Sequence, residues 1–213
     1  MVGDRRSLPL FPLNLVLFPE SQLTLHIFEE RYKTMVRQCW KDETEFGVNL
    51  YENNYLHPVG CTARIEGILR SYPDGSFDIL IVGTARYRLV DYMTTSTGYF
   101  QGEVDRFGDT QAEVPDALVS KALALYNRIV EMAYPGKEEL RLARESRDIS
   151  LFSYAIAEKA GIELQDRQRL LEQTSELERL TEVVAHMERV MPLLQDFERV
   201  KRIISNDGYM PRR

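Results

Sequence analysis

The residue types that most often carry chemistry are few in this chain and widely spaced. Its three histidines, His26, His57 and His186, have no metal-ligand spacing among themselves or to either cysteine, Cys39 or Cys61. The sequence contains no Walker-type phosphate loop, no G-x-G-x-x-G, no G-x-S-x-G elbow and no H-E-x-x-H. We therefore predict no catalytic residues, no metal site and no cofactor.

Two local groupings remain as candidates. His26 lies on the polar face of a predicted strand, where it is either an ordinary hydrogen-bonded structural histidine or part of a binding groove. Glu29, Glu30 and Arg31 could suggest acid–base chemistry, but the helix dipole also favours acidic residues in a first helical turn. We interpret the run as a solvated first turn in which Glu29 pairs with Lys33 at i,i+4.

Both groupings fall in the stretch Leu8–Met35, LPLFPLNLVLFPESQLTLHIFEERYKTM, which has the most informative pattern in the chain. Its first segment, Leu8–Leu13, is apolar and predicts a short strand. Pro9 and Pro12 interrupt it, and because proline cannot donate to a ladder we expect this strand at a sheet edge or a bulge. A hooked loop, a second strand and a helix are expected to follow.

Periodicity assigns the remaining elements of the first half, since alternation predicts strands and a 3.6-residue repeat predicts helix. Asn53-Asn54 and Pro73-Asp74-Gly75 predict turns. The expected elements are a strand at Gln22–Phe28, a helix at Glu29–Lys41, and strands at Phe46–Tyr51, His57–Tyr72, Phe77–Tyr92 and Phe100–Phe107. Several long strands with one early helix are typical of a small closed or nearly closed barrel.

A polar linker is expected at Gly108–Asp116, and the spacing of apolar residues after it predicts helices throughout the second half. Ser175 and Glu178 form a capping box for the last helix, and Pro192 within its heptad stripe Leu177–Leu194 should kink that helix or end its first half. The other helices are expected at Leu118–Ala133, Ile149–Ala160 and Leu164–Gln173. The expected domains are a barrel at 1–109, a helical bundle at 110–205 and a tail at 206–213.

The composition is that of a folded, acidic chain, with 44% apolar residues and a net charge of −6. Residues 1–109 hold 11 basic against 15 acidic side chains and the rest hold 16 against 18, so we expect no nucleic-acid partner. The sequence has no apolar run of about eighteen residues and no secretory signal pattern, so we expect no membrane association. Cys39 and Cys61 are expected to be buried free thiols in a reducing cytoplasm.

The run LPLFPLNLVLFPE followed by LTLHIFEERYKTMV resembles the opening of the Lon protease N-terminal, substrate-recognition domain. VGCTARI at Val59–Ile65 and IVGTARYRLVDY at Ile81–Tyr92 resemble the same family, and the stretch from Leu170 is similar to its helical end. Glu20 and Thr24 replace a loop glycine and a second proline of the family pattern, so this loop is expected to differ in shape. The resemblance covers most of the chain and is strongest in about its first hundred residues.

The resemblance implies an α+β fold in which an N-terminal PUA-like β pseudo-barrel precedes a C-terminal α-helical bundle. It also implies a non-catalytic module for unfolded or extended protein segments, in the stand-alone bacterial form that lacks the ATPase and serine–lysine peptidase domains. The expected peptide-binding residues are Phe18, His26, Phe28, Arg31, Tyr32 and Tyr51. The expected partner is an unfolded polypeptide or a specific protein.

Three other functions stay open at this point. PUA-like barrels resemble RNA-binding ones, although the acidic balance argues against RNA. A hydrolase or small-ligand enzyme would need a convergent set of reactive groups, which the sequence does not offer. A scaffold could dimerise through the stripe Leu177–Leu194, although we prefer packing inside its own bundle and expect a monomer or a weak dimer.

Overall fold

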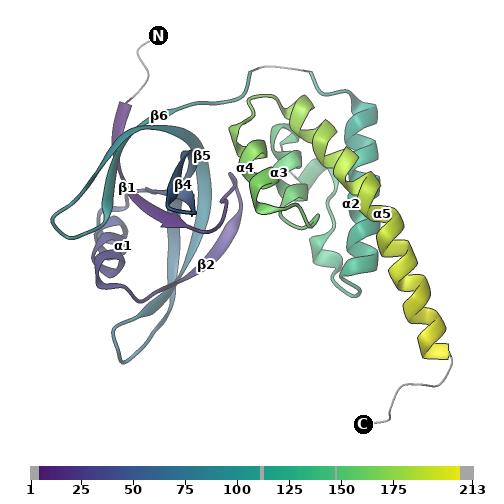
Figure 1. Cartoon of the computed structure of the whole chain (residues 1–213), viewed down its shortest axis with the longest axis horizontal. Coiled ribbons are helices and arrows are strands. Elements are labelled where there is room, and N and C mark those ends of the chain that lie inside the picture. The colour runs from purple at the N-terminus through teal and green to yellow at the C-terminus, as the bar shows by residue number, and fades with distance from the viewer. Residues whose placement is uncertain (1–4, 111–112, 147, 207–213) are drawn as a thin grey trace. The chain divides into compact units, whose positions relative to one another are not determined.

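The computed structural model describes residues 5–110, 113–146 and 148–206 (Figure 1). The chain forms two compact units. The barrel unit comprises Met1–Thr110 and Glu163–Thr174, and the helical unit comprises Gln111–Ile162 and Ser175–Arg213. A unit based on a sheet and a unit based on helices confirm the predicted α+β class. Residues 207–213 of the predicted tail lie outside the described residues.

The elements of the barrel unit follow the predicted order, with ends that shift by a few residues. Each predicted strand of the first half is present, and the early helix begins one residue later than expected. The bounds are β1 Arg5–Leu13, β2 Gln22–Ile27, α1 Glu30–Asp42, β3 Phe46–Glu52, β4 Tyr55–Ser71, β5 Phe77–Thr94, β6 Phe100–Arg106 and α4 Leu164–Glu172.

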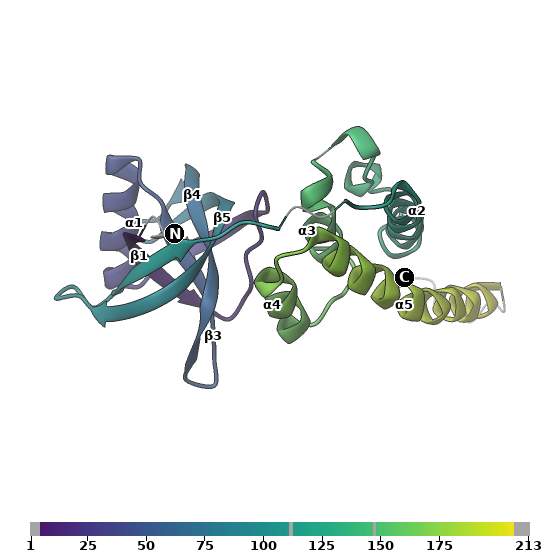
Figure 2. The same ribbon diagram turned by 90° about the horizontal axis from the view of Figure 1, so that it is seen from above.

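The strands form one mixed sheet in the order β2-β5-β4-β3-β1-β6, and an additional pairing of β6 with β5 closes it into a barrel (Figure 2). Strand β5 pairs with β4 along one edge and is long enough to pair with two strands along the other. There β2 pairs with Phe77–Val82 and β6 pairs with Tyr87–Thr94. The predicted turn between β3 and β4 is confirmed at Asn53 and Asn54, whose φ angles of 51° and 62° suit asparagine.

Strand β1 lies between β3 and β6 rather than at an edge, so the predicted edge position is wrong for the strand as a whole. The two pairings are offset, since β6 pairs with Arg5–Leu10 and β3 with Leu10–Leu13. Pro9 and Pro12 therefore each have a strand partner on one side. A missing backbone N–H is tolerated at such positions because no second ladder needs it.

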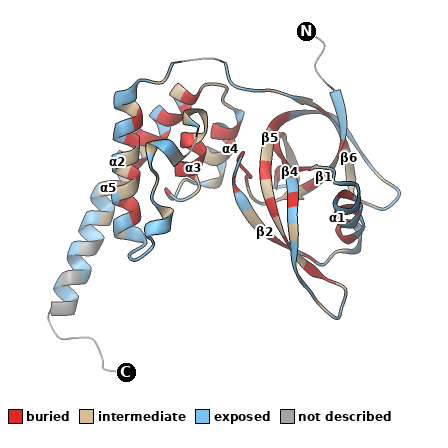
Figure 3. Cartoon of the chain, turned by 180° about the vertical axis from the view of Figure 1, so that it is seen from behind, coloured by how far each residue is buried: buried red, intermediate tan, exposed pale blue. Residues whose placement is uncertain are grey.

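The core of the barrel unit forms between the inward faces of the strands and the apolar stripe of α1 (Figure 3). The ring of Tyr32 on α1 stacks on Phe11 of β1 with centroids 4.2 Å apart. Met35 and Val36 are each 1% exposed. Tyr32, Met35 and Val36 therefore lie on the face of α1 that packs against the sheet.

Helix α4 belongs to the barrel unit by its contacts, although the sequence analysis grouped it with the helical bundle. Gln168 Nε2 donates to the carbonyl oxygen of Val59 at 3.1 Å. The buried Arg86 donates to the carbonyl oxygen of Leu171 at 3.0 Å, in the last turn, where helix carbonyls lack intrahelical partners. Amphipathic spacing indicates which face of a helix is buried but not its partner. The ranges 1–109 and 110–205 as separately folding domains remain a prediction.

The helical unit is built from three α-helices and short 3₁₀ segments among the described residues. The amide of Asn127 ties one 3₁₀-rich segment to α2, because it donates to and accepts from the backbone of Leu142 at 2.9 Å. The bounds are α2 Asp116–Ala133, η1 Glu138–Leu140, η2 Arg144–Ser146, η3 Ile149–Leu151, α3 Phe152–Ala157 and α5 Glu176–Asn206.

The first half of α5 contributes to the core of the helical unit. Leu180, Val184 and Met187 of the predicted stripe are at most 4% exposed, so packing inside the unit accounts for them. The helix continues through Pro192, so the predicted end of its first half does not occur there. Beyond this proline the side chains become exposed, as for Phe197 at 66% (Figure 3).

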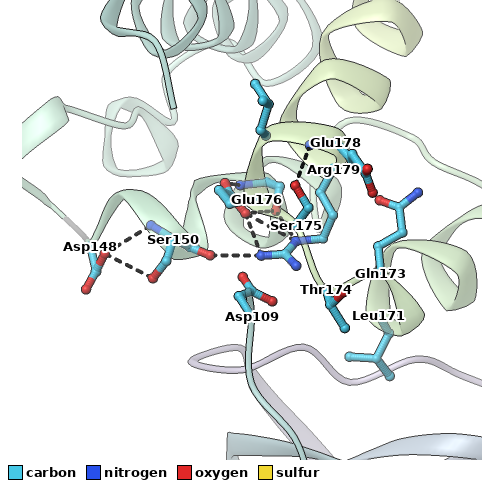
Figure 4. Close-up of polar contacts among 12 residues, drawn as sticks. Asp109, Asp148, Ser150, Leu171, Gln173, Thr174, Ser175, Glu176, Glu178 and Arg179 are labelled. Atoms are coloured by element: carbon cyan, nitrogen blue, oxygen red, sulfur yellow. Dashed lines mark hydrogen bonds and ion pairs between the residues drawn. The ribbon is translucent and has the colours of Figure 1, made fainter. Parts of the chain in front are cut away.

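A buried ion pair within the first turn of α5 is hydrogen-bonded to α3 and to η3. Arg179 Nη2 lies 2.7 Å from Glu176 Oε2, and these residues are 0% and 4% exposed (Figure 4). Ser153 Oγ donates to Glu176 Oε2 at 2.6 Å, and Arg179 Nη2 donates to the carbonyl oxygen of Ser150 at 3.1 Å. Burial raises the pKa of Glu176 to about 7, against the opposing effects of Ser153 and Arg179.

Candidate functional site

A solvent-facing cluster on the barrel unit gathers side chains that can hold a ligand. It consists of His26, Phe28, Arg70, Tyr72 and Asp78, and we call it the His26 cluster. Strands β2, β5 and β4 run side by side here, and the register pairs His26 with Asp78 and Asp78 with Arg70. Opposed residues of neighbouring strands share a face, so these three side chains project from one side of the sheet. Phe28 and Tyr72 directly follow β2 and β4.

The carboxylate of Asp78 holds two partners at once. His26 Nδ1 lies 2.6 Å from Asp78 Oδ1, and Tyr72 OH donates to Asp78 Oδ2 at 2.7 Å. The His26 ring stacks beside Phe28 at a centroid distance of 5.9 Å and meets Tyr72 edge-on at 5.4 Å. These contacts fix the orientation of an imidazole whose side chain is 50% exposed.

The electrostatics of the cluster assign the hydrogen on the imidazole. Hydrogen bonds from His26 and Tyr72 hold the pKa of Asp78 below its usual range, and the bond to Asp78 raises the pKa of Tyr72. An ionised carboxylate can only accept hydrogen bonds, so Nδ1 of His26 carries the hydrogen and donates. Nε2 is left for a ligand, because His26 has no other hydrogen-bond partner among the described residues.

The cluster is suited to binding rather than to covalent chemistry. A His–Asp pair activates a nucleophile when a hydroxyl or thiol lies within hydrogen-bond reach of the imidazole. In the described part of the chain no serine, threonine or cysteine side chain bonds to His26. The same residues include no group of three His, Cys, Asp or Glu side chains arranged to hold a metal ion.

The structure brings two of the six predicted binding residues, His26 and Phe28, into this cluster. Phe28 is 62% exposed, a high value for a phenylalanine. Arg31 is also exposed; its Nε donates to Glu29 Oε2 at 2.9 Å, and its Cζ lies 4.6 Å from the ring centroid of Tyr32. Arg31 therefore extends the polar surface on α1.

The other three predicted residues lie elsewhere. Phe18 and Tyr32 are 1% and 6% exposed, so their rings belong to the core and present no surface to a peptide in this structure. Tyr51 is 39% exposed on β3, where its hydroxyl donates to Asn54 Oδ1 at 3.4 Å. The predicted aromatic residues thus divide between core and surface in a way that the sequence pattern does not indicate.

The predicted pairing of Glu29 with Lys33 is wrong. Lys33 Nζ instead pairs with Glu30 Oε1 at 2.8 Å, and Glu29 pairs with Arg31. The side chain of Lys33 is only 6% exposed, since it also reaches the carbonyl oxygen of Asp74. That contact comes from the turn between β4 and β5, which local sequence spacing does not reveal.

Sequence reasoning missed Arg70, Tyr72 and Asp78. Tyr72 and Asp78 flank the predicted turn Pro73-Asp74-Gly75, and a hairpin there brings the two strand ends together. Their nearness to each other could have been deduced from that turn. Their nearness to His26 depends on the register of β2 against β5, which nothing in the local pattern sets.

Residues 7–189 match the family model described as the ATP-dependent protease La (LON) substrate-binding domain. The chain belongs to this family. Its similarity extends to solved structures: a Lon N-terminal domain protein from Xanthomonas campestris has a TM-score of 0.68 and 26% identity, covering 84% of this chain and 98% of that one. The N-terminal domain of a Mycobacterium avium complex Lon protease has a TM-score of 0.63 at 14% identity, covering 86% and 98%, and supports the fold alone.

The curated relatives of this Lon-type domain are much longer than it is. Lon protease 2 of Herpetosiphon aurantiacus is 25% identical over 178 residues, which are 78% of this chain and 22% of that protein. Lon protease 2 of Bdellovibrio bacteriovorus is 27% identical over 190 residues, covering 81% and 23%. The chain therefore spans less than a quarter of the Lon proteases that it matches.

These likenesses confirm the resemblance inferred from the sequence and the predicted fold class, a PUA-like barrel followed by a helical region. None of the helices in the described residues is long and apolar enough to cross a membrane.

Proposed function

We propose that this chain is a non-catalytic polypeptide-recognition module that binds unfolded or extended protein segments through the His26 cluster. The main observation in support of this proposal is the high exposure of Phe28. A phenylalanine that is 62% exposed and stacked beside an oriented imidazole offers apolar surface next to a directed hydrogen-bonding group. Membership of a family named for substrate binding supports the same reading.

An extended polypeptide presents the complementary groups. Its apolar side chains can pack on the rings of Phe28 and Tyr72, and its unpaired backbone amides need hydrogen-bond partners. His26 Nε2 accepts from a peptide N–H when the imidazole is neutral and donates to a carbonyl when it is protonated. A folded protein buries both kinds of group, so the module is expected to discriminate by folding state.

Fluorescence anisotropy tests the proposal. A labelled, reduced and carboxymethylated protein that cannot refold is titrated with the purified chain. The same protein with its disulfides intact serves as the folded control. We expect saturable binding of the unfolded form and none of the folded form; equal affinity for both, or no binding of either, contradicts the proposal.

An RNA oligomer belongs in the same experiment as the competing ligand class. The net charge of −6 disfavours it, because binding a phosphate backbone draws on clustered lysine and arginine. Affinity for the oligomer that falls steeply with added salt, in the absence of polypeptide binding, would favour an RNA-binding function instead.

A further inference from the structure

An open hollow on the barrel unit, separate from the His26 cluster, is lined by polar, charged and aromatic side chains. It encloses about 480 Å³ between α4 and the start of β4. All of its lining residues belong to the barrel unit. They are Tyr55, His57, Pro58, Val59, Arg88, Gln165, Gln168, Arg169 and Glu172.

One face of α4 makes the first wall. Gln165, Gln168, Arg169 and Glu172 follow one another at spacings of three, one and three residues, which places them on the same side of a helix. Gln168 anchors this wall, because its Nε2 donates both to the carbonyl oxygen of Val59 at 3.1 Å and to Glu172 Oε1 at 2.8 Å. Gln165 Nε2 adds a bond to Glu52 Oε2 at 3.1 Å.

Strands β4 and β5 make the second wall. Tyr55 is 57% exposed, and its ring meets that of His57 edge-on at 4.9 Å. Arg88 on β5 stands opposite Val59 on β4 in the register, so both lie at the same level of the sheet. An aromatic ring and a guanidinium thus border the same hollow.

Two polar groups of the pocket have unmet hydrogen-bonding capacity. Arg88 is exposed and lies 5.6 Å from the ring centroid of Phe107, and it has no ion pair or hydrogen bond within the described residues. Gln168 is 3% exposed, and its Oε1 atom accepts no hydrogen bond. A buried acceptor without a donor is unusual and costly, and the exposed guanidinium of Arg88 is available to an anion.

We propose that this pocket binds the C-terminal end of an extended polypeptide. The terminal carboxylate would pair with Arg88, since guanidinium groups bind carboxylates in a bidentate manner. Arg169, whose Nη1 lies 2.6 Å from Asp166 Oδ1, adds positive charge at the same hollow. The amide N–H of the terminal residue would supply the donor that Gln168 Oε1 lacks. Gln168 Oε1 is shielded in this structure, so the new bond requires the contact between Gln168 Nε2 and Glu172 Oε1 to open.

The unmet acceptor distinguishes this ligand from a simple anion. Inorganic phosphate or a carboxylate side chain would satisfy Arg88 but brings no amide N–H placed beside its charge. Capture of a terminal carboxylate next to a backbone amide is a recurring mode of peptide recognition. The inference rests on the proposed function and gives it a second contact site for the same class of ligand.

The test compares three labelled peptides of one unfolded sequence by anisotropy. One ends in a free carboxylate, one ends in a carboxamide, and one ends in aspartate with its main-chain carboxyl amidated. We expect the free acid to bind the full chain about tenfold more tightly than the carboxamide, a preference typical of one charge-assisted pair. The aspartyl amide should bind like the carboxamide.

Variants connect the preference to the pocket. Arg88→Gln and Arg169→Gln are exposed substitutions that should leave folding intact and reduce the preference to about twofold or less. Arg64→Gln, an exposed arginine of β4 outside the pocket that pairs with Glu66, is the matched control and should keep the full preference.

The outcomes separate the two proposals. Equal binding of free acid and carboxamide overturns the terminal-carboxylate inference and leaves polypeptide recognition standing, whereas no binding of any peptide defeats both. Tight binding of the aspartyl amide shows that a side-chain carboxylate suffices and contradicts capture of a chain end. A preference that survives both pocket variants shows that the carboxylate binds elsewhere.

Discussion

The phenol of Tyr87 occupies the space that the missing side chain of Gly47 leaves on β3. A Cβ atom added at Gly47 would lie 2.7 Å from Tyr87 Cζ and 2.9 Å from a methyl carbon of Leu10, closer than carbon atoms pack. Tyr87 itself is 0% exposed, and its hydroxyl donates to Asn49 Oδ1. The ring therefore cannot move aside without losing a buried hydrogen bond.

The substitution Gly47→Ala should consequently destabilise the barrel unit by about 3 kcal/mol through overpacking. Gly67→Ala is the control on β4, because an added Cβ there meets nothing within 4 Å. It should change stability by no more than about 1 kcal/mol, in the stabilising direction, since alanine loses less backbone entropy in a strand. Urea unfolding followed by circular dichroism measures both; similar losses for the two variants would contradict this packing.

The buried Glu176 should make stability fall as pH rises from about 4.5 to about 7. Its pKa is about 7 in the folded chain against an ordinary value of 4.5, so the folded state binds more protons in that window. The loss amounts to at most about 3 kcal/mol by linkage. Urea midpoints measured across this pH range provide the test.

Glu176→Gln supplies the comparison, because glutamine does not titrate. Below about pH 7 the neutral amide of the variant resembles the protonated carboxyl of Glu176, and only at higher pH does Arg179 lack a carboxylate partner in the variant. The informative quantity is how steeply the free energy of unfolding changes with pH. All other carboxyls contribute equally in both proteins, so the difference between the two slopes reports on Glu176. A slope that is equal in the two proteins would show that Glu176 is ionised throughout.

Neither cysteine should react with iodoacetamide in the folded chain at pH 8. Cys39 and Cys61 are 2% and 0% exposed, and burial raises the pKa of both thiols, that of Cys61 to about 12. The thiolate is the reactive form, so both access and ionisation oppose alkylation. Mass spectrometry should find both modified after unfolding in urea, and rapid labelling of Cys61 without urea would contradict the barrel core described here.

The parts of the fold that local chemistry sets were predictable from the sequence. Proline and glycine in Pro73-Asp74-Gly75 and the asparagine pair Asn53-Asn54 specify tight turns, and the strands between them alternate clearly. The start of the last helix was likewise predictable, because Ser175 Oγ accepts from the N–H of Glu178 at 3.3 Å, which is one of the two bonds of the predicted capping box.

Long-range partners were not predictable from the same patterns. The helix α4 shows an apolar face in the sequence, but its place on the barrel depends on Gln168 and on the buried Arg86, which lie far apart along the chain. Asp78 joined the candidate site for a similar reason, because its contact with His26 depends on strand register. His26 and Phe28 could be proposed from the sequence because both lie in the stretch Leu8–Met35.

The most direct test of polypeptide recognition at the His26 cluster compares two exposed aromatic residues of the barrel unit. Phe28 and Trp40 are 62% and 43% exposed, so replacing either with alanine should change stability by less than about 0.5 kcal/mol. Phe28→Ala should weaken binding of a labelled unfolded polypeptide by about tenfold, as expected for an aromatic contact residue. Trp40→Ala, on α1 outside the cluster, should leave the affinity within about twofold, a difference within ordinary surface effects. Unchanged affinity of Phe28→Ala would contradict the assignment of this surface as the binding site.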